Sequence, residues 1–301
     1  MDDSCYSLAL FLLFLFLISK CFLQKQKQRK NLPPSPLSLP IIGHLHLMKE
    51  PLHRTSNSLS DKYGPILYLR LGSRSVVVVS SPSAVEECFT KNDIIFANRP
   101  LGLAGKLLNY NNTTLGASPY GQHWRNLRRL TTVEIFSTNR LNMFSGIRRE
   151  EVQLLLKQLF KNCNGGTAKV ELKSRFSEFS FSIMLRMITG KRYCGEDGVN
   201  LEFRDIIKEI LDLSCECNFG DLVPVLQWVD FQGMEKRMLK LQRKTDVFLK
   251  GLIDEHRRMR SNSSSSSEEE RNNSTINVML SLQEANPEYY TDEIIKGIIL
   301  V

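Results

Sequence analysis

The feature that most constrains this chain is an apolar run near its N-terminus, LALFLLFLFLI at residues 8–18. Together with Cys21–Leu23, the run approaches the length that crosses a bilayer. Asp2 and Asp3 precede it and no A-x-A pattern follows, which argues against a cleaved secretory signal. We therefore expect residues 1–23 to form a retained N-terminal membrane anchor.

Positive charge follows this run on its C-terminal side only. The basic residues are Lys20, Lys25, Lys27, Arg29 and Lys30. Because such flanks stay on the cytosolic side of a membrane, we expect the bulk of the chain in the cytosol. Prolines between residues 33 and 40 fix φ and remove backbone donors, so residues 24–43 are expected to be a basic, proline-rich linker.

The orientation of the anchor makes a prediction about glycosylation. N-x-S/T sequons begin at Asn111, Asn112, Asn262, Asn272 and Asn273. In a cytosolic chain all of them should remain without glycan.

Residues 44–301 are long enough to bury a large core, and 42% of the 301 residues are hydrophobic. The formal net charge of +8 favours an acidic partner or a membrane surface. The basic residues are spread along the chain and are not clustered with aromatic residues in a known module, which disfavours nucleic-acid binding. The seven cysteines form no C-x-x-C pair, and their odd number does not suit a framework of disulfide pairs. We therefore interpret them as reduced thiols.

Periodicity and turn residues predict a mainly α fold with one small β element. The strings ILYLRLG and SVVVVSS, joined through Gly72, Ser73 and Arg74, predict a β-hairpin. Ser81-Pro82 and Ser118-Pro119 each predict a cap followed by a helix, and the second of these helices carries HWRNLRR. Further helices are expected over about 51–63, 138–161, 172–189, 200–217 and 229–260, with FGDLVP as a break and 261–274 as a solvated loop.

The last residues, TDEIIKGIILV, predict a helix that begins after Thr291 and is apolar on nearly every face. No polar exit follows Val301. We therefore expect the sequence to be incomplete at its C-terminus, cut near the start of a central helix.

Within HWRNLRR, Trp124 and Arg128 lie one helical turn apart on one face. An indole N–H and a guanidinium side by side suit a buried carboxylate or another anion. Spacing alone nevertheless favours a simpler helix, which packs its tryptophan in the core and directs its arginines outward.

The order of motifs resembles the plant microsomal cytochrome P-450 monooxygenases, which are haem-thiolate enzymes. The likeness rests on the anchor and on PPSPLSLPIIGH, KYGPILYLRLGSRSVVVVSSP, FANRP, SPYGQHWRNLRR, NFGDLVP and YYTDEIIKGIILV. It implies the cytochrome P-450 fold, an endoplasmic reticulum membrane location, and haem as cofactor. It also implies that Trp124 and Arg128 donate to a haem propionate.

Arg125 and Arg129 would belong to a basic surface that docks an acidic reductase, or are ordinary solvated arginines.

The resemblance further implies that the irregular loop before this helix and the segment around FGDLVP cover the substrate. We expect the pocket to be lined by Leu107, Thr114, Ala117 and Leu213, although plain core packing also explains each of them. FGDLVP and the helix before it could also contact lipid.

The family's iron ligand is a cysteine in a loop that reads F-x-x-G-x-R-x-C-x-G. Cys194 has part of this pattern, but Met187 and Glu196 stand at its first and last positions, and we interpret it as a chance match. We expect no axial cysteine, no catalytic residue and no metal ligand set in this chain, which alone should be inactive because a thiolate supplies the electron density for oxygen activation.

The sequence therefore predicts the N-terminal portion of a monooxygenase that uses O2 and NADPH electrons delivered by a reductase. FANRP, GKRYCGEDG and NPEYYTDEIIKG resemble the group with isoflavone hydroxylases, so a phenolic, isoflavonoid or phenylpropanoid-like substrate is expected. The alternative is a non-catalytic, membrane-anchored protein that binds the reductase as a decoy.

Overall fold

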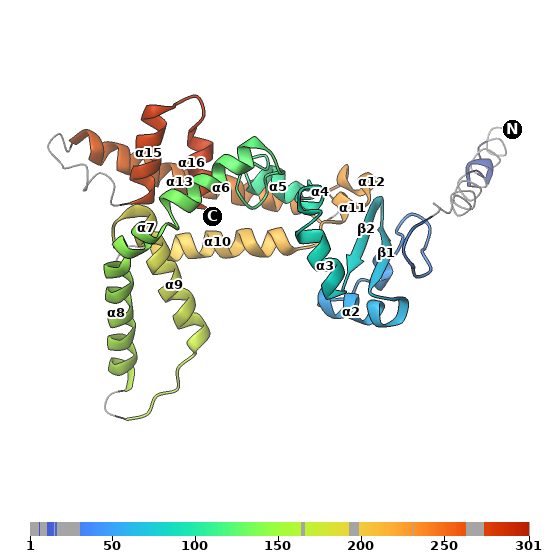
Figure 1. Ribbon diagram of the computed structural model, residues 1–301, viewed down its shortest axis with the longest axis horizontal. Coiled ribbons are helices and arrows are strands. Elements are labelled where there is room, and N and C mark those ends of the chain that lie inside the picture. Colours follow the sequence, from blue (N-terminus) through green and yellow to red (C-terminus); the bar gives the residue numbers. More distant parts are fainter. Residues whose placement is uncertain are drawn as a thin grey trace. The chain divides into compact units, whose positions relative to one another are not determined.

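The computed structural model describes residues 6, 11–14, 16, 31–163, 166–192, 199–230, 232–262 and 274–300 (Figure 1). The expected anchor and the first half of the expected linker lie largely outside these residues. Among the residues that are described, none of the helices combines the length and the apolar character needed to cross a bilayer.

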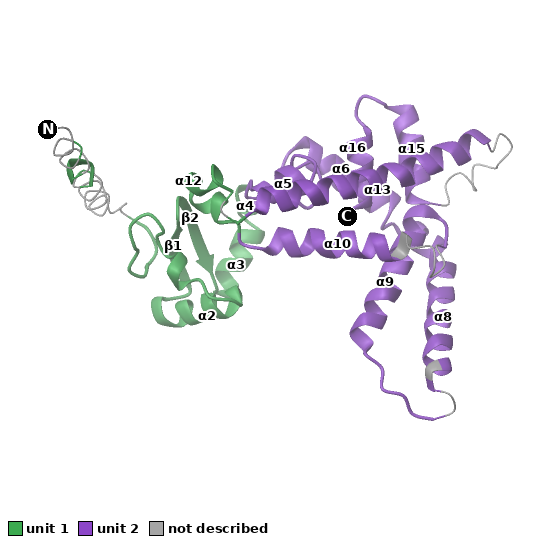
Figure 2. Ribbon diagram, turned by 180° about the vertical axis from the view of Figure 1, so that it is seen from behind, with its two compact units in different colours: residues 1–96, 218–232 green, residues 97–217, 233–301 purple. Residues whose placement is uncertain are grey.

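The chain divides into two compact units, coloured separately in Figure 2. Unit 1 comprises residues 1–96 and 218–232, and unit 2 comprises residues 97–217 and 233–301. Each unit therefore takes residues from two separate stretches of the chain. This division inside residues 44–301 was not predicted, because it depends on contacts between segments that are far apart in sequence.

Unit 1 is built around the expected hairpin. Strands β1 (Ile66–Leu71) and β2 (Arg74–Val79) pair antiparallel, with Leu71 opposite Arg74. Gly72 in the turn has a φ of +60°, and a Cβ there would lie 2.2 Å from the carbonyl oxygen of Leu222. Glycine is thus required by both the backbone conformation and the close approach of another segment.

That other segment is FGDLVP, which is a break between long helices as expected but itself contains helical turns. Helices α11 (Phe219–Leu222) and α12 (Pro224–Gln227) fill it. The Ser73 N–H donates to the carbonyl oxygen of Leu222 at 2.7 Å, and Arg74 Nε donates to that of Asp221 at 2.8 Å. FGDLVP is therefore fixed to the hairpin turn.

The remaining elements of unit 1 largely follow the sequence. They are the 3-10 helix η1 (Leu45–Leu47) and helices α2 (Leu52–Tyr63), α3 (Pro82–Phe89) and α4 (Asp93–Phe96). The Ser81 side chain accepts from the Ala84 N–H, which confirms the expected cap. The cap expected at Ser118 is wrong: the helix that carries HWRNLRR begins at Gln122 after Gly121, with no side-chain cap.

Unit 2 is helical in its described residues. Its helices are α5 (Leu103–Leu108), α6 (Gln122–Glu134), α7 (Thr138–Met143), α8 (Ser145–Cys163), α9 (Leu172–Thr189), α10 (Val199–Cys215), α13 (Met234–Asn262), α15 (Thr275–Ala285) and α16 (Asp292–Ile299). The helix expected over 138–161 is divided at Phe144, and α13 begins five residues later than expected. The mainly α fold with a small hairpin is confirmed.

Two apolar clusters hold unit 2 together. The larger joins α6, α9, α13, α15 and α16 through residues that include Leu127, Leu185, Leu249, Met279 and Ile295. The smaller joins α5, α10 and α13 through Leu103, Leu108, Leu213, Met234, Met238 and Leu241. Helix α16 is buried on several faces, because Ile295 to Ile299 are all buried within the described chain. This burial explains its continuous apolar sequence.

Candidate functional site

Helix α6 carries the candidate site, and the turn before it is held by a hydrogen bond from the backbone to a side chain. The Tyr120 N–H donates to Asn98 Oδ1 at 3.1 Å, which ties the SPYG turn to the FANRP segment. Leu127 and Leu130 face the large apolar cluster and orient the helix. The side chains on its other face are thereby directed away from the core.

Trp124 and Arg128 lie together on that other face. The Arg128 guanidinium carbon is 5.3 Å from the centre of the Trp124 indole, a cation–π distance. Trp124 is half-buried and Arg128 is exposed, so the tryptophan is not packed in the core as spacing alone favoured. Tyr120 extends the group, with its ring centre 5.5 Å from that of Trp124.

The chemistry of this pair suits a carboxylate. An indole N–H and a guanidinium are donors only, and neither makes a side-chain hydrogen bond or ion pair to any residue in the described part of the chain. A propionate of haem would supply the negative charge and the acceptor oxygens that both groups lack. The residues present therefore fit the group that the sequence resemblance implied.

Arg125 and Arg129, the expected partner-binding residues, are both exposed on α6. Arg125 lies over the Tyr120 ring, 5.7 Å from its centre, and donates to Gln122 Oε1 at 3.3 Å. The two arginines lie beside the Trp124–Arg128 pair in sequence and add positive charge to the same helix. Their role in docking a reductase stays a prediction.

The expected substrate residues fall into two groups. Leu107 and Leu213 lie in the same apolar cluster, where Leu213 is almost completely buried. Thr114 and Ala117 lie in the loop before α6, and the buried Thr114 donates through Oγ1 to Asn109 Oδ1 at 3.0 Å. Thr114 also lies against Gly297 of α16. The structure places the loop beside α16, and the lining role of these residues stays a prediction.

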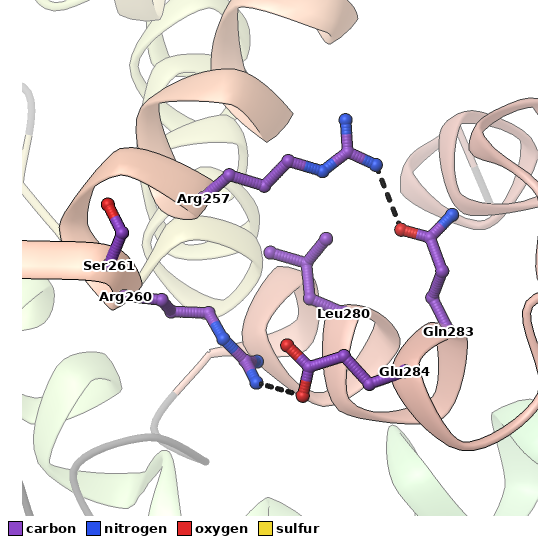
Figure 3. Close-up of a pocket in the computed structure, with 6 residues that line it drawn as sticks. All are labelled: Arg257, Arg260, Ser261, Leu280, Gln283 and Glu284. Atoms are coloured by element: carbon purple, nitrogen blue, oxygen red, sulfur yellow. Dashed lines mark hydrogen bonds and ion pairs between the residues drawn. The ribbon is translucent and has the colours of Figure 1, made fainter. Parts of the chain in front are cut away.

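Two cavities in unit 2 are lined by other residues. One of about 780 Å³ is lined by residues 132–134 at the end of α6, residues 136–140 and Met143. The other, of about 410 Å³, is drawn in Figure 3 and is lined by Arg257, Arg260, Ser261, Leu280, Gln283 and Glu284. Its two arginines are paired within the protein, because Arg257 binds Gln283 and Asp292, and Arg260 binds Glu284.

Sequence reasoning missed His123, which immediately precedes Trp124. Its Nε2 lies 2.9 Å from the carbonyl oxygen of Thr113, and its Nδ1 lies 3.2 Å from the Tyr289 hydroxyl. Two sequence features pointed to this contact: the histidine lies inside HWRNLRR, and YYTDEIIKG contains two tyrosines. Both motifs were used only to support the family resemblance. No spacing rule links residues 123 and 289.

The structure offers no metal site in the residues that it describes, where no three His, Cys, Asp or Glu side chains gather in a suitable arrangement. Cys194, interpreted as a chance match to the haem-ligand loop, lies outside the described residues.

A helical fold with a small hairpin, and a helix that presents an indole and a guanidinium together, agree with the family that the sequence resembles. The sequence profile of the family Cytochrome P450 matches residues 33–301, and the chain belongs to this family.

Its relatives include Cytochrome P450 81E8 of Medicago truncatula, 50% identical over 98% of this chain and 58% of the relative. Isoflavone 2'-hydroxylase of Glycyrrhiza echinata is 48% identical, over 99% of this chain and 59% of the relative. Isoflavone 3'-hydroxylase of Medicago truncatula is 49% identical, over 91% of this chain and 55% of the relative. The chain thus spans little more than half the length of these relatives.

A solved structure of a zebra fish cytochrome P450 with progesterone aligns with a TM-score of 0.64. The alignment covers 84% of this chain and 55% of the solved one, at 20% identity. This likeness supports the fold.

Proposed function

We propose that the chain is the N-terminal part of a haem-thiolate monooxygenase that hydroxylates a plant phenolic compound. The observation that carries the proposal is the Trp124–Arg128 pair, whose donors lie together on α6 with the guanidinium 5.3 Å from the indole centre. The relatives whose names state a reaction, isoflavone 2'- and 3'-hydroxylases, support the reaction class.

In this proposal the chain's own residues hold the cofactor. The Trp124 indole N–H and the Arg128 guanidinium donate to one propionate, and the cation–π contact keeps both groups on one side of the helix. Haem, when bound through a cysteine thiolate, activates O2 with electrons from NADPH that a reductase delivers. Arg125 and Arg129 add positive charge to the surface that receives the reductase.

The substrate is a flat, mostly apolar phenolic of the isoflavonoid kind. The cluster around Leu107 and Leu213 supplies apolar surface, and the loop with Thr114 and Ala117 lies beside α16, where the Thr114 methyl carbon faces Gly297. A pocket with mostly apolar walls and few polar groups suits such a molecule.

We also propose that residues 1–23 anchor the chain in the endoplasmic reticulum membrane, with the rest in the cytosol. The apolar run and the basic residues after it support this placement. Treatment of the expressed chain with a glycosidase should leave its electrophoretic mobility unchanged, and a shift would contradict the cytosolic placement.

The cofactor role is tested in a chimera that joins residues 1–301 to the C-terminal remainder of the Glycyrrhiza isoflavone 2'-hydroxylase. The chimera should show a haem Soret band and, with reductase, NADPH and O2, add one oxygen atom to an isoflavone. Trp124→Phe and Arg128→Ala should each speed haem loss to apomyoglobin by about tenfold. The first removes the indole donor and the second removes the charge-assisted guanidinium donors. Arg149→Gln, an exposed arginine on α8, is the charge-matched control.

If the chimera in which both Trp124 and Arg128 are replaced loads and retains haem as well as the unmodified chimera, the proposed cofactor role is contradicted. If the 301-residue chain captures the reductase in a pull-down and the chimera shows no haem absorbance, the decoy function is supported instead.

A further inference from the structure

The contacts of His123 are unusual because each ring nitrogen meets a different segment of unit 2. Nε2 lies 2.9 Å from the Thr113 carbonyl oxygen in the loop before α6. Nδ1 lies 3.2 Å from the hydroxyl of Tyr289, in the connection between α15 and α16. The two rings also meet edge to face, with centres 6.0 Å apart. The imidazole therefore joins three segments at the first turn of α6.

Hydrogen-bond chemistry identifies the donor at Nε2 of this ring. A carbonyl oxygen only accepts, so Nε2 must carry the proton that faces Thr113. Nδ1 of the neutral ring then accepts from the Tyr289 O–H. Burial raises the pKa of the Tyr289 hydroxyl, which keeps it protonated as the donor. One neutral tautomer satisfies all three groups.

The loop bound by His123 has a backbone that needs outside support. Tyr110, Asn111 and Asn112 all have positive φ, from 45° to 61°. Non-glycine residues seldom adopt this conformation, and three in succession persist only where neighbouring contacts hold them. The Asn112 N–H donates to the Gly105 carbonyl oxygen at 2.9 Å on one side of the turn. His123 supports the other side through Thr113.

We propose that His123 is a positioning residue, which fixes the first turn of α6, and with it the Trp124 indole, to the 109–118 loop and the α15–α16 connection. The site deepens the proposed function, because Trp124 is the proposed propionate donor and the loop is the proposed substrate cover. Order in the loop and the position of the cofactor donor are thereby linked through one imidazole.

The experiment uses the whole 301-residue chain, without haem, so that it does not depend on the cofactor role. Trp228 is the second tryptophan and is 90% exposed, so Trp228→Phe leaves Trp124 as a single fluorescent reporter. In this background the parent should shield Trp124 from acrylamide. His123→Phe and Tyr289→Phe should each raise the quenching constant by about twofold, because the turn opens locally.

A conservative variant separates the effect of the two hydrogen bonds from the effect of side-chain size. His123→Gln carries an N–H for Thr113 and an oxygen for Tyr289, and should restore most of the shielding. The control His53→Phe makes the same chemical change at an exposed histidine of α2 and should have no effect. Hydrogen exchange of residues 110–127 provides a second measurement and should quicken by about tenfold in His123→Phe.

An unshielded Trp124 in the parent would overturn the positioning role, as would equal quenching and exchange in the parent, His123→Phe and Tyr289→Phe. A loss of shielding in His123→Phe that His123→Gln does not restore would also count against it. Haem retention in the chimera is measured separately, so failure of the cofactor role is distinguished from failure of the positioning role.

Discussion

Arginines of unit 2 occupy two contrasting settings. Between α8 and α9, Arg186 donates to Glu150 at 2.8 Å and to the buried Glu151 at 2.7 Å, and Arg192 donates to the same Glu151 at 2.7 Å. On α6, Arg128 has an indole as its neighbour and no carboxylate within the described residues. One arginine completes a network inside the protein, and the other presents its charge outward.

The difference indicates which cations serve stability and which are available to a ligand. A buried carboxylate is tolerated only when paired, so Glu151 needs its two arginines for folding. A cation with no protein partner contributes little to folding and retains its donors for an anion from elsewhere. Four substitutions test this contrast, from the largest expected effect to the smallest.

Glu151→Ala should have the largest effect. It removes a carboxylate that is 3% exposed and leaves Arg186 and Arg192 without their common partner. We expect the free energy of unfolding to fall by about 3 kcal/mol, measured by urea denaturation followed by circular dichroism. Glu150→Ala, next in sequence and bound to the same Arg186 but exposed, is the matched control and should cost much less than Glu151→Ala. Equal losses would contradict the contrast.

Asp246→Ala should come next. Asp246 of α13 accepts from the buried Lys296 of α16 at 2.6 Å and from the Tyr110 hydroxyl at 3.4 Å. Burial and the nearby Asp246 raise the pKa of Tyr110, so its hydroxyl remains a donor. Removal of the carboxylate leaves a buried ammonium unpaired and should cost about 2 kcal/mol in urea denaturation.

Lys296→Met provides the control for this pair. Its loss leaves Asp246, whose side chain is 36% exposed and can be solvated, so the cost should be smaller than that of Asp246→Ala. A larger cost for Lys296→Met would contradict this explanation, because methionine keeps an unbranched apolar side chain and removes only the charge of the lysine.

Asp292 predicts a smaller, pH-dependent effect. Hydrogen bonds from Arg257 lower the pKa of Asp292 below its ordinary value, and Gln283 contributes as well. Because the folded-state pKa is lowered, this stabilisation is complete above the ordinary aspartate pKa of about 4 and is lost as the pH falls through the folded-state value. Asp292→Asn should cost less than about 1 kcal/mol near pH 7, since the pair is partly exposed.

The measurement is the urea midpoint of the parent and Asp292→Asn between neutral pH and pH 3. The difference between the two proteins should shrink as the pH falls below about 4. A difference that stays constant over this range would mean that the carboxylate charge contributes nothing to stability.

Much of the fold was readable from sequence because the signals were local. The hairpin at residues 66–79, the helix capped by Ser81 and the placement of Trp124 and Arg128 one turn apart all depend on neighbouring residues. The Ser118 cap failed for a tertiary reason. Tyr120, two residues after Ser118, donates its backbone N–H to Asn98, and the helix begins only after Gly121.

Long-range contacts were the part that sequence could not supply. Helix α15, which directly follows the polar 261–274 stretch, was not predicted, although Ser274 caps it by accepting from the Asn277 N–H. The bridge from His123 to Tyr289 was missed as well, because it spans 166 residues. Periodicity identifies the face that a side chain occupies but not the distant segment that it meets.

Arg128→Gln should have the smallest effect on stability and gives the sharpest test of the contrast. Because the guanidinium is exposed and pairs with no carboxylate among the residues that the structure describes, its loss should change the free energy of unfolding by less than about 0.5 kcal/mol. Arg186→Gln, the same change at the paired arginine, should cost about 2 kcal/mol, because the buried Glu151 then loses one of its two arginine partners. If Arg128→Gln destabilised the chain as much as Arg186→Gln, the α6 arginine would be a structural cation, and its availability to a propionate would lose its physical basis.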